Sequence, residues 1–196
     1  MNDRPATPMR IEAGDVVLAV LGPDAAEEVA GVINANLDHL GPWMVWAQRA
    51  TNAQEQAMRL ATGLEHAETG ADGSYTILVG GRVVGGCGLH RRAGEGTLDI
   101  GYWIAAEHGS RGIVTTAAAA LAHVAFEHHG ATQVRITCDE ANVRSAAVPA
   151  RLGFVHVDTL DEPRTAPATT NRTMVWVMTR ERWPESPGAA IAVSYA

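Results

Sequence analysis

The stretch EHGSRGIVTTAA, residues 107–118, places two glycines, an arginine and two threonines directly before an alanine-rich segment. It follows TLDIGYWI, which predicts a β-strand over 97–104, and it precedes a helix that we expect from about Gly112 to about His129. A glycine-rich turn from strand to helix leaves the first backbone N–H groups of the helix unpaired, at its partly positive end. The stretch is therefore typical of an anion-binding turn, although a simple loop with Ser110 as helix cap explains the same residues.

A second polar motif follows the next predicted strand, in CDEANVRSAAVPARLGF over 138–154. Asn142 and Ser145 stand near the start of a short helix that we expect over 143–152, where ordinary caps also occur. Pro149 is less ordinary, because it lacks the N–H that would pair with the carbonyl of Ser145. A free carbonyl beside a hydroxyl indicates a bend that faces a ligand.

The remaining patterns alternate between strand and helix and contain no internal repeat, which predicts one α/β domain. Glycines 80 and 81 separate two β-rich runs and predict a hairpin. The further expected elements are a strand at 15–21, a helix opening at Pro23, hairpin strands at 74–79 and 82–89, strands at 134–138, 154–160 and 173–179, and a polar loop at 161–171.

Composition narrows the class of protein. A chain of 196 residues with 46% hydrophobic content is long enough for a substantial core. The net charge of -7 argues against nucleic acid as a partner, and it suits either a cationic substrate or solubility alone. No run reaches the roughly 18 apolar residues that span a bilayer, and the N-terminus lacks an apolar leader, so we expect a cytoplasmic protein without membrane contact.

Cysteine and histidine usage predicts no metal site. Cys87 and Cys138 stand in apolar, strand-like runs without C-x-x-C spacing, which predicts buried reduced thiols. His123, His128 and His129 lack the spacing of H-E-x-x-H, and no carboxylate partner fits them. We expect these three to be solvated side chains at the end of a helix.

Three segments together resemble the GNAT superfamily of acyl-CoA-dependent N-acyltransferases, within it the RimJ/RimL-like branch. They are NLDHLGPWMVW (36–46), LDIGYWIAAEHGSRGIVTTA (98–117) and CDEANVRSAAVPARLGF (138–154), and their order and spacing also match. The resemblance covers roughly residues 10–182, which leaves 183–196 as a C-terminal tail.

This resemblance implies an α/β (α+β) architecture, the GNAT fold. It consists of a mixed sheet of six to seven strands flanked by helices. Strands 97–104 and 133–139 would lie side by side in parallel and splay apart. The resemblance leaves a homodimer open.

The resemblance also implies acetyl-CoA as acyl donor, with its pantetheine arm in the gap between the splayed strands and its pyrophosphate on the turn over 111–115. The chain departs from the usual Gln/Arg-x-x-Gly-x-Gly/Ala pattern, since Gly109 and Val114 occupy its first and last positions. Ser110 also stands where many relatives have glycine. Backbone N–H groups do most of the holding, so these departures are tolerable. The implied acyl-CoA contacts are Ile104, Arg111, Gly112, Ile113, Val114, Thr115, Asn142 and Ser145.

Amide formation requires an amine that has lost a proton, a stabilised oxyanion and a protonated leaving thiolate. By resemblance, the N–H near Ile104 serves the oxyanion, and Asn142 with Ser145 contacts the pantetheine and the sulfur. Asp99 is the candidate base, since strand alternation places it with Gly101 on the face that must border the thioester. Its alternative is a structural carboxylate.

The resemblance implies that the helical segment after the first strand and the loop that follows it form the acceptor site. Paired tryptophans there either hold a cationic amine or belong to the core. The acceptor is a peptide N-terminus or a small-molecule amine, such as an antibiotic or metabolite. Two alternatives stay open: an acyltransferase that uses a bulkier acyl donor, and a catalytically idle acyl-CoA-binding module. The candidate acceptor residues are Asp38, His39, Trp43 and Trp46.

Overall fold

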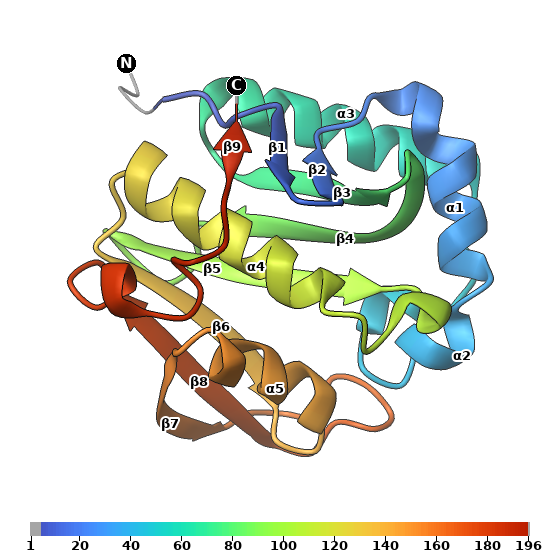
Figure 1. The fold of residues 1–196 in the computed structure, drawn as a ribbon. Helices are drawn as coiled ribbons and strands as arrows, with labels where there is room; N and C mark the ends of the chain where they lie inside the picture. The colour runs from blue at the N-terminus through green and yellow to red at the C-terminus, as the bar shows by residue number, and fades with distance from the viewer. Residues whose placement is uncertain (1–4, 196) are drawn as a thin grey trace.

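The computed structural model describes residues 5–195, which form one mixed sheet of nine strands in the order β7-β8-β6-β5-β4-β3-β2-β1-β9 (Figure 1). Of the neighbouring strands in this described range, only β5 and β6 run parallel. The strands are β1 (Arg10–Ala13), β2 (Val16–Ala19), β3 (Gly73–Val79), β4 (Arg82–His90), β5 (Thr97–Ile104), β6 (Gln133–Asp139), β7 (Val155–Asp161), β8 (Arg172–Thr179) and β9 (Ser194–Tyr195).

Helices cover both faces of the sheet. In Figure 1, α4 and α5 lie in front of the sheet, and α3 lies behind it. A π-helical turn, Val124–His128, continues α4. The helices are α1 (Ala26–Asn34), α2 (Leu37–Leu40), α3 (Ala53–Thr69), α4 (Ile113–His123) and α5 (Val143–Arg151).

The parallel strands β5 and β6 pair over a short distance only. Their register joins Thr97 to Gln133, Leu98 to Val134 and Asp99 to Arg135. Beyond Asp99 the two strands diverge, so the sheet opens in its middle. The predicted mixed fold with one parallel pair is confirmed.

The core lies where α4 packs on the sheet. Its alanines from 117 to 120 are all at most 1% exposed, and Leu121 and Phe126 are fully buried beside them. Small side chains let the helix approach the strands closely, so it buries its apolar face at high packing density. The alanine-rich run therefore fixes the position of the turn at its start.

The expected elements around the two motifs are confirmed, but the N-terminal part was incompletely predicted. The helix expected from Pro23 is a 3₁₀ turn followed by the separate helices α1 and α2. The strand expected at 15–21 is limited to β2, and β1, α3 and β9 were not expected. The sheet has nine strands in the described range instead of six to seven because the short β1 and β9 extend one edge.

The described residues after 182, which are 183–195, pack into the domain. Trp183 is 3% exposed and belongs to the main hydrophobic cluster. In the last strand, Ser194 and Tyr195 pair with β1. The boundary placed at residue 183 from the sequence therefore does not coincide with a structural boundary.

The two cysteines are free and buried, as expected. The expectation of solvated histidines is wrong, because His123, His128 and His129 are all half-buried. The Nε2 atom of His123 is buried, and its ring packs edge-on against Trp183 with centroids 5.1 Å apart. Burial lowers the pKa of His129 to about 4, with help from nearby positive charge. The ring of His129 packs edge-on against His128, with centroids 4.9 Å apart.

Residues 5–195 contain no helix long and apolar enough to cross a membrane. The same range has no group of three or more histidine, cysteine, aspartate or glutamate side chains arranged to hold a metal ion.

Candidate active site

The turn before α4 is open and positively polarised. Gly112 is the N-cap residue with a φ of 79°, and a β-carbon placed there would meet no atom within 4 Å. The first intrahelical bond runs from Thr116 N to Gly112 O, and no side chain of the described residues caps the helix. The N–H groups before Thr116 therefore face outward, as anion binding requires. The turn brings together the expected phosphate contacts Arg111, Gly112, Ile113, Val114 and Thr115.

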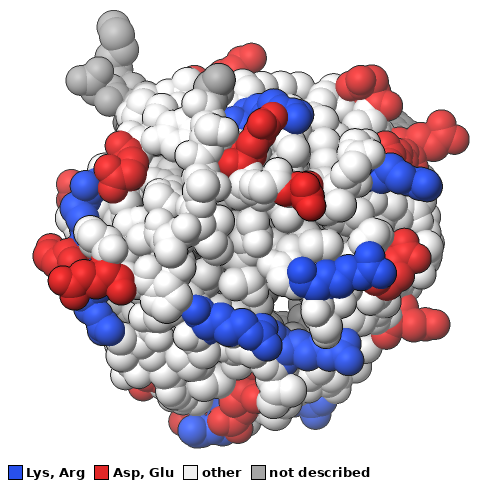
Figure 2. All heavy atoms as spheres, viewed as in Figure 1, with Lys and Arg blue, Asp and Glu red and all other residues white. Residues whose placement is uncertain are grey.

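Positive charge gathers beside this turn although the chain is acidic overall. All 15 basic residues are arginines. Arg111 stands before α4, and Arg144 and Arg151 stand on α5, all three exposed. Figure 2 shows basic side chains around a hollow in this face of the molecule. This face therefore suits a ligand with several phosphates.

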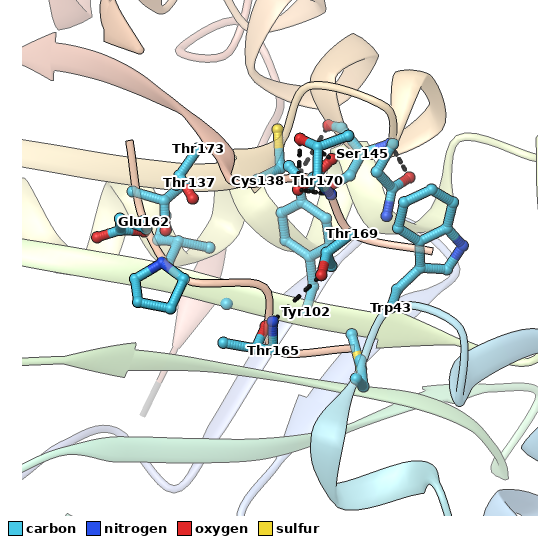
Figure 3. Close-up of a pocket in the computed structure, with 16 residues that line it drawn as sticks. Trp43, Tyr102, Thr137, Cys138, Ser145, Glu162, Thr165, Thr169, Thr170 and Thr173 are labelled. Carbon is cyan, nitrogen blue, oxygen red and sulfur yellow. Dashed lines mark hydrogen bonds between the residues drawn. The ribbon is translucent and has the colours of Figure 1, made fainter. Parts of the chain in front are cut away.

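A cavity of about 330 Å³ begins where β5 and β6 cease to pair. Figure 3 shows the side chains that line it. Many of them carry hydroxyls, so the cavity offers donors and acceptors as well as aromatic surface. The lining residues are Trp43, Met44, Ile100, Gly101, Tyr102, Thr137, Cys138, Asp139, Asn142, Ser145, Glu162, Pro163, Thr165, Thr169, Thr170 and Thr173.

The start of α5 presents a hydroxyl pair to the cavity. Asn142 Oδ1 accepts the N–H of Ser145 at 3.1 Å and caps the helix. Pro149 lies inside the helix, and the carbonyl of Ser145 instead accepts the Tyr102 hydroxyl at 3.0 Å, which agrees with the predicted free carbonyl. Ser145 Oγ in turn donates to Tyr102 Oη at 3.3 Å. The structure thus brings Asn142 and Ser145 together at the cavity and adds Tyr102, which sequence reasoning missed.

Tyr102 is a protonated hydroxyl at neutral pH. Burial raises the pKa of its phenol, and the hydrogen bond with Ser145 opposes this only partly. Burial likewise raises the pKa of the Cys138 thiol in the same wall. Tyr102 can therefore donate a proton or a hydrogen bond, whereas neither group supplies a basic site at neutral pH.

Asp99 lies in an ion pair at the closed end of the gap. Arg135 Nε donates to its Oδ1 at 2.6 Å, and Arg135 Nη2 donates to its Oδ2 at 3.0 Å. These bonds raise the pKa of Arg135. Both carboxylate oxygens are engaged, and Asp99 is absent from the described cavity lining. Asp99 therefore has a structural role as the counter-ion of Arg135, and its role as a base stays a prediction.

We expect Asp99→Asn to lower the free energy of unfolding by about 1–3 kcal/mol, because Arg135 keeps its half-buried charge and loses its counter-ion. Denaturant unfolding measures this change. Glu12→Gln is the control, since the Arg10–Glu12 pair is exposed and should contribute no more than about 0.5 kcal/mol. An unchanged stability together with an about 10²-fold loss of turnover that recovers at high pH would instead identify Asp99 as the base.

The four candidate acceptor residues separate in space. Trp43 lines the cavity. Trp46 packs edge-on against Trp103, with centroids 5.8 Å apart, in a second hydrophobic cluster, so it has the core role that the sequence left open. Asp38 is exposed and His39 is half-buried on α2, and the described cavity lining includes neither.

The loop between β7 and β8 forms a cavity wall that sequence reasoning missed. Its Ala168 N–H donates to the carbonyl of Pro42 at 2.8 Å, which ties the loop to the segment after α2. Asp139 accepts the N–H of Thr170 at 2.7 Å and is a structural carboxylate. Glu162 lines the cavity from this loop. A polar loop has no periodic pattern, so only its carboxylate and hydroxyl content hinted at a site.

The comparisons with known proteins agree with this geometry. Residues 16–155 match the model of the acetyltransferase (GNAT) domain, so the chain belongs to the GNAT acetyltransferases and is an acyltransferase. Within that family it is 31% identical over 147 residues to YdaF of Bacillus subtilis (strain 168), whose name assigns it to the ribosomal N-acetyltransferases. That match covers 71% of this chain and 78% of YdaF.

Two solved structures show the same fold. Mycobacterium smegmatis RimJ in complex with CoA-disulfide superposes with a TM-score of 0.79 at 24% identity, covering 94% of this chain and 91% of RimJ. RimL, a ribosomal L7/L12 α-N-protein acetyltransferase in complex with coenzyme A, gives a TM-score of 0.78 at 16% identity, covering 89% and 98%. The chain is thus similar to YdaF in sequence and to RimJ and RimL in fold, and the expected membership of the GNAT superfamily is confirmed.

Proposed function

We propose that the protein transfers an acetyl group from acetyl-CoA to a primary amine. The observation that carries this proposal is the continuity of one site. The open turn at Gly112 and the hydroxyl pair at Ser145 flank the gap between β5 and β6, which leads into the cavity. A long donor with phosphates at one end and a thioester at the other fits this order of groups.

The residues present fit the donor in three ways. The outward N–H groups after Gly112 suit a pyrophosphate, and the exposed arginines beside them add charge. The unpaired edges of β5 and β6 can hydrogen-bond an amide-containing arm. The N–H of Ile104, at the end of β5, is the proposed partner for the thioester oxygen.

The proposed acceptor is a primary amine that enters from the hydroxyl-rich side of the cavity. The names of the similar proteins favour the α-amine at a protein N-terminus. Trp43 offers an aromatic face and Glu162 a carboxylate to a cationic amine. A small-molecule amine is the second candidate, favoured by the modest volume of the cavity.

The test is amine-dependent release of free thiol from acetyl-CoA, with the product checked by mass spectrometry. The acceptors are peptides with the N-terminal sequences of ribosomal proteins and, in parallel, aminoglycoside-like amines. Transfer to either class supports the proposal and identifies the acceptor class. Tight coenzyme A binding without thiol release for any amine would instead indicate an acyl-CoA-binding module.

We expect Gly112→Val to weaken coenzyme A binding at least tenfold, which is about 1.4 kcal/mol. A branched side chain there blocks the approach of a phosphate to the backbone and strains a residue with a φ of 79°. Calorimetry measures the dissociation constant.

Gly130→Val is the matched control for this prediction. Gly130 also has a positive φ, 66°, and open space around its Cα, but it follows the other end of α4. Its variant should show a similar loss of stability and unchanged affinity for coenzyme A. Unchanged affinity in a folded Gly112→Val variant would show that the turn does not hold the phosphates.

A further inference from the structure

A histidine–aspartate pair lies beside the closed end of the cavity. His90 is the last residue of β4, and its Nδ1 lies 3.0 Å from Oδ2 of Asp72, in the turn between α3 and β3. The other carboxylate oxygen, Oδ1, accepts the N–H of Arg91 at 3.0 Å. The two contacts fix the carboxylate, so Nδ1 is the nitrogen assigned the hydrogen. Nε2 is then left with its lone pair.

The Nε2 edge of His90 faces two glycines. A β-carbon on Gly88 would lie 3.0 Å from Nε2, and one on Gly101 would lie 3.9 Å from it. These glycines are directly opposite each other in the register of β4 and β5, and Gly101 lines the cavity. Because glycine has no side chain, the Nε2 edge lies beside the backbone of Gly101, which is part of the cavity wall. Ile104 lies three residues further along β5, roughly 10 Å away, so the proton would travel through water molecules in the cavity.

The neighbouring charged groups are less suited to accept a proton. Asp99 is the register partner of His90, but both of its oxygens accept bonds from Arg135. Glu162 lines the cavity, and its carboxylate interacts electrostatically with Arg135. Imidazole is the side chain that enzymes use most often as a general base, and an acetyl acceptor must lose a proton before it attacks. The charged groups that surround His90 are Asp72, Arg91, Asp99, Arg135 and, across the cavity, Glu162.

We propose that His90, oriented by Asp72, accepts the proton that the acceptor amine loses before it attacks the thioester, by way of water molecules in the cavity. This inference rests on the proposed function. The ammonium group gives one proton to Nε2, and its nitrogen then forms a C–N bond with the carbonyl carbon. The C–S bond breaks, the sulfur leaves with the electron pair, and it takes up the second proton lost by the nitrogen, by way of the hydroxyls of Ser145 and Tyr102. His90 finally releases its proton to solvent.

The test compares pH profiles of His90→Gln and the wild type with an amine that the wild type acetylates. We expect turnover to fall about 10²-fold at pH 7 and to recover at high pH, where the amine is already neutral. The fall of kcat/KM toward low pH, which is the acidic limb of the profile, should be lost. The dissociation constant for acetyl-CoA should stay unchanged. His156→Gln, on the exposed face of β7, is the control and should retain the wild-type profile.

Two further variants keep the inference open to refutation even if His90→Gln does not fold. Asp72→Asn keeps the imidazole but removes its orienting carboxylate, so it should displace the acidic limb and lower turnover about tenfold. Glu162→Gln removes the carboxylate proposed to attract the amine, so it should raise KM for the amine but keep the acidic limb. A wild-type profile in His90→Gln or Asp72→Asn, or a limb lost in Glu162→Gln alone, would overturn the role of His90. Absence of amine-dependent turnover in the wild type would refute the proposed function itself.

Discussion

Trp183→Ala is expected to lower the free energy of unfolding by about 3–5 kcal/mol, the range for loss of a large buried aromatic side chain. Trp183 packs against Phe126 with centroids 5.5 Å apart and against His123 at 5.1 Å. Gly188 folds back over its ring, where a β-carbon would lie 2.7 Å from the indole. The C-terminal segment therefore covers the π-helical end of α4. Denaturant unfolding measures the change, and an m-value equal to that of the wild type shows that the change is one of stability.

Tyr195→Ala is the control within the same segment. Tyr195 is 38% exposed, so its removal should change stability by less than about 1 kcal/mol. Wild-type stability of Trp183→Ala would mean that the segment adds little to the core. Residues 183–196 would then behave as the appended tail that the sequence suggested.

The elements around the glycine turn were predictable because their signals are local. The strand at 97–104 alternates over eight residues, and the structure gives β5 the same bounds. Helix α3 has 17 residues, but only Gln56, Gly63 and Ala67 are buried, so it carries no strong apolar stripe. Strand β1 has four residues, too few to show a period.

The site was predictable only where its contacts are short in sequence. Asn142 caps Ser145 three residues later, a pattern visible in the chain. The partners Tyr102 and Ser145 are 43 residues apart, and Asp99 and Arg135 are 36 apart. The first pair depends on how α5 lies against β5, and the second depends on the register of β5 and β6, neither of which one sequence specifies. The sequence therefore indicated Asp99 as a base, because its partner Arg135 could not be identified from the sequence.

Ser145→Ala is expected to lower turnover about 10²-fold while the dissociation constant for acetyl-CoA changes less than about threefold. The Ser145 hydroxyl donates to Tyr102 Oη, and burial keeps that phenol protonated. The pair can therefore donate a proton to the departing thiolate. Because this transfer takes place mainly in the transition state, its loss should lower turnover more than donor affinity. The helix cap and the bond from Tyr102 use main-chain atoms of Ser145, so alanine preserves both.

The kinetic signature separates this role from a binding role. Calorimetry gives the affinity for acetyl-CoA, and steady-state assays give kcat and KM for donor and acceptor. Ser74→Ala, an exposed serine on β3, is the control and should match the wild type. Because Ser145 and Tyr102 share one proton path, Tyr102→Phe should reduce turnover similarly, and the double variant should lose little more than either single one. An effect confined to KM for acetyl-CoA would make Ser145 a binding residue and leave the proton of the thiolate to another donor.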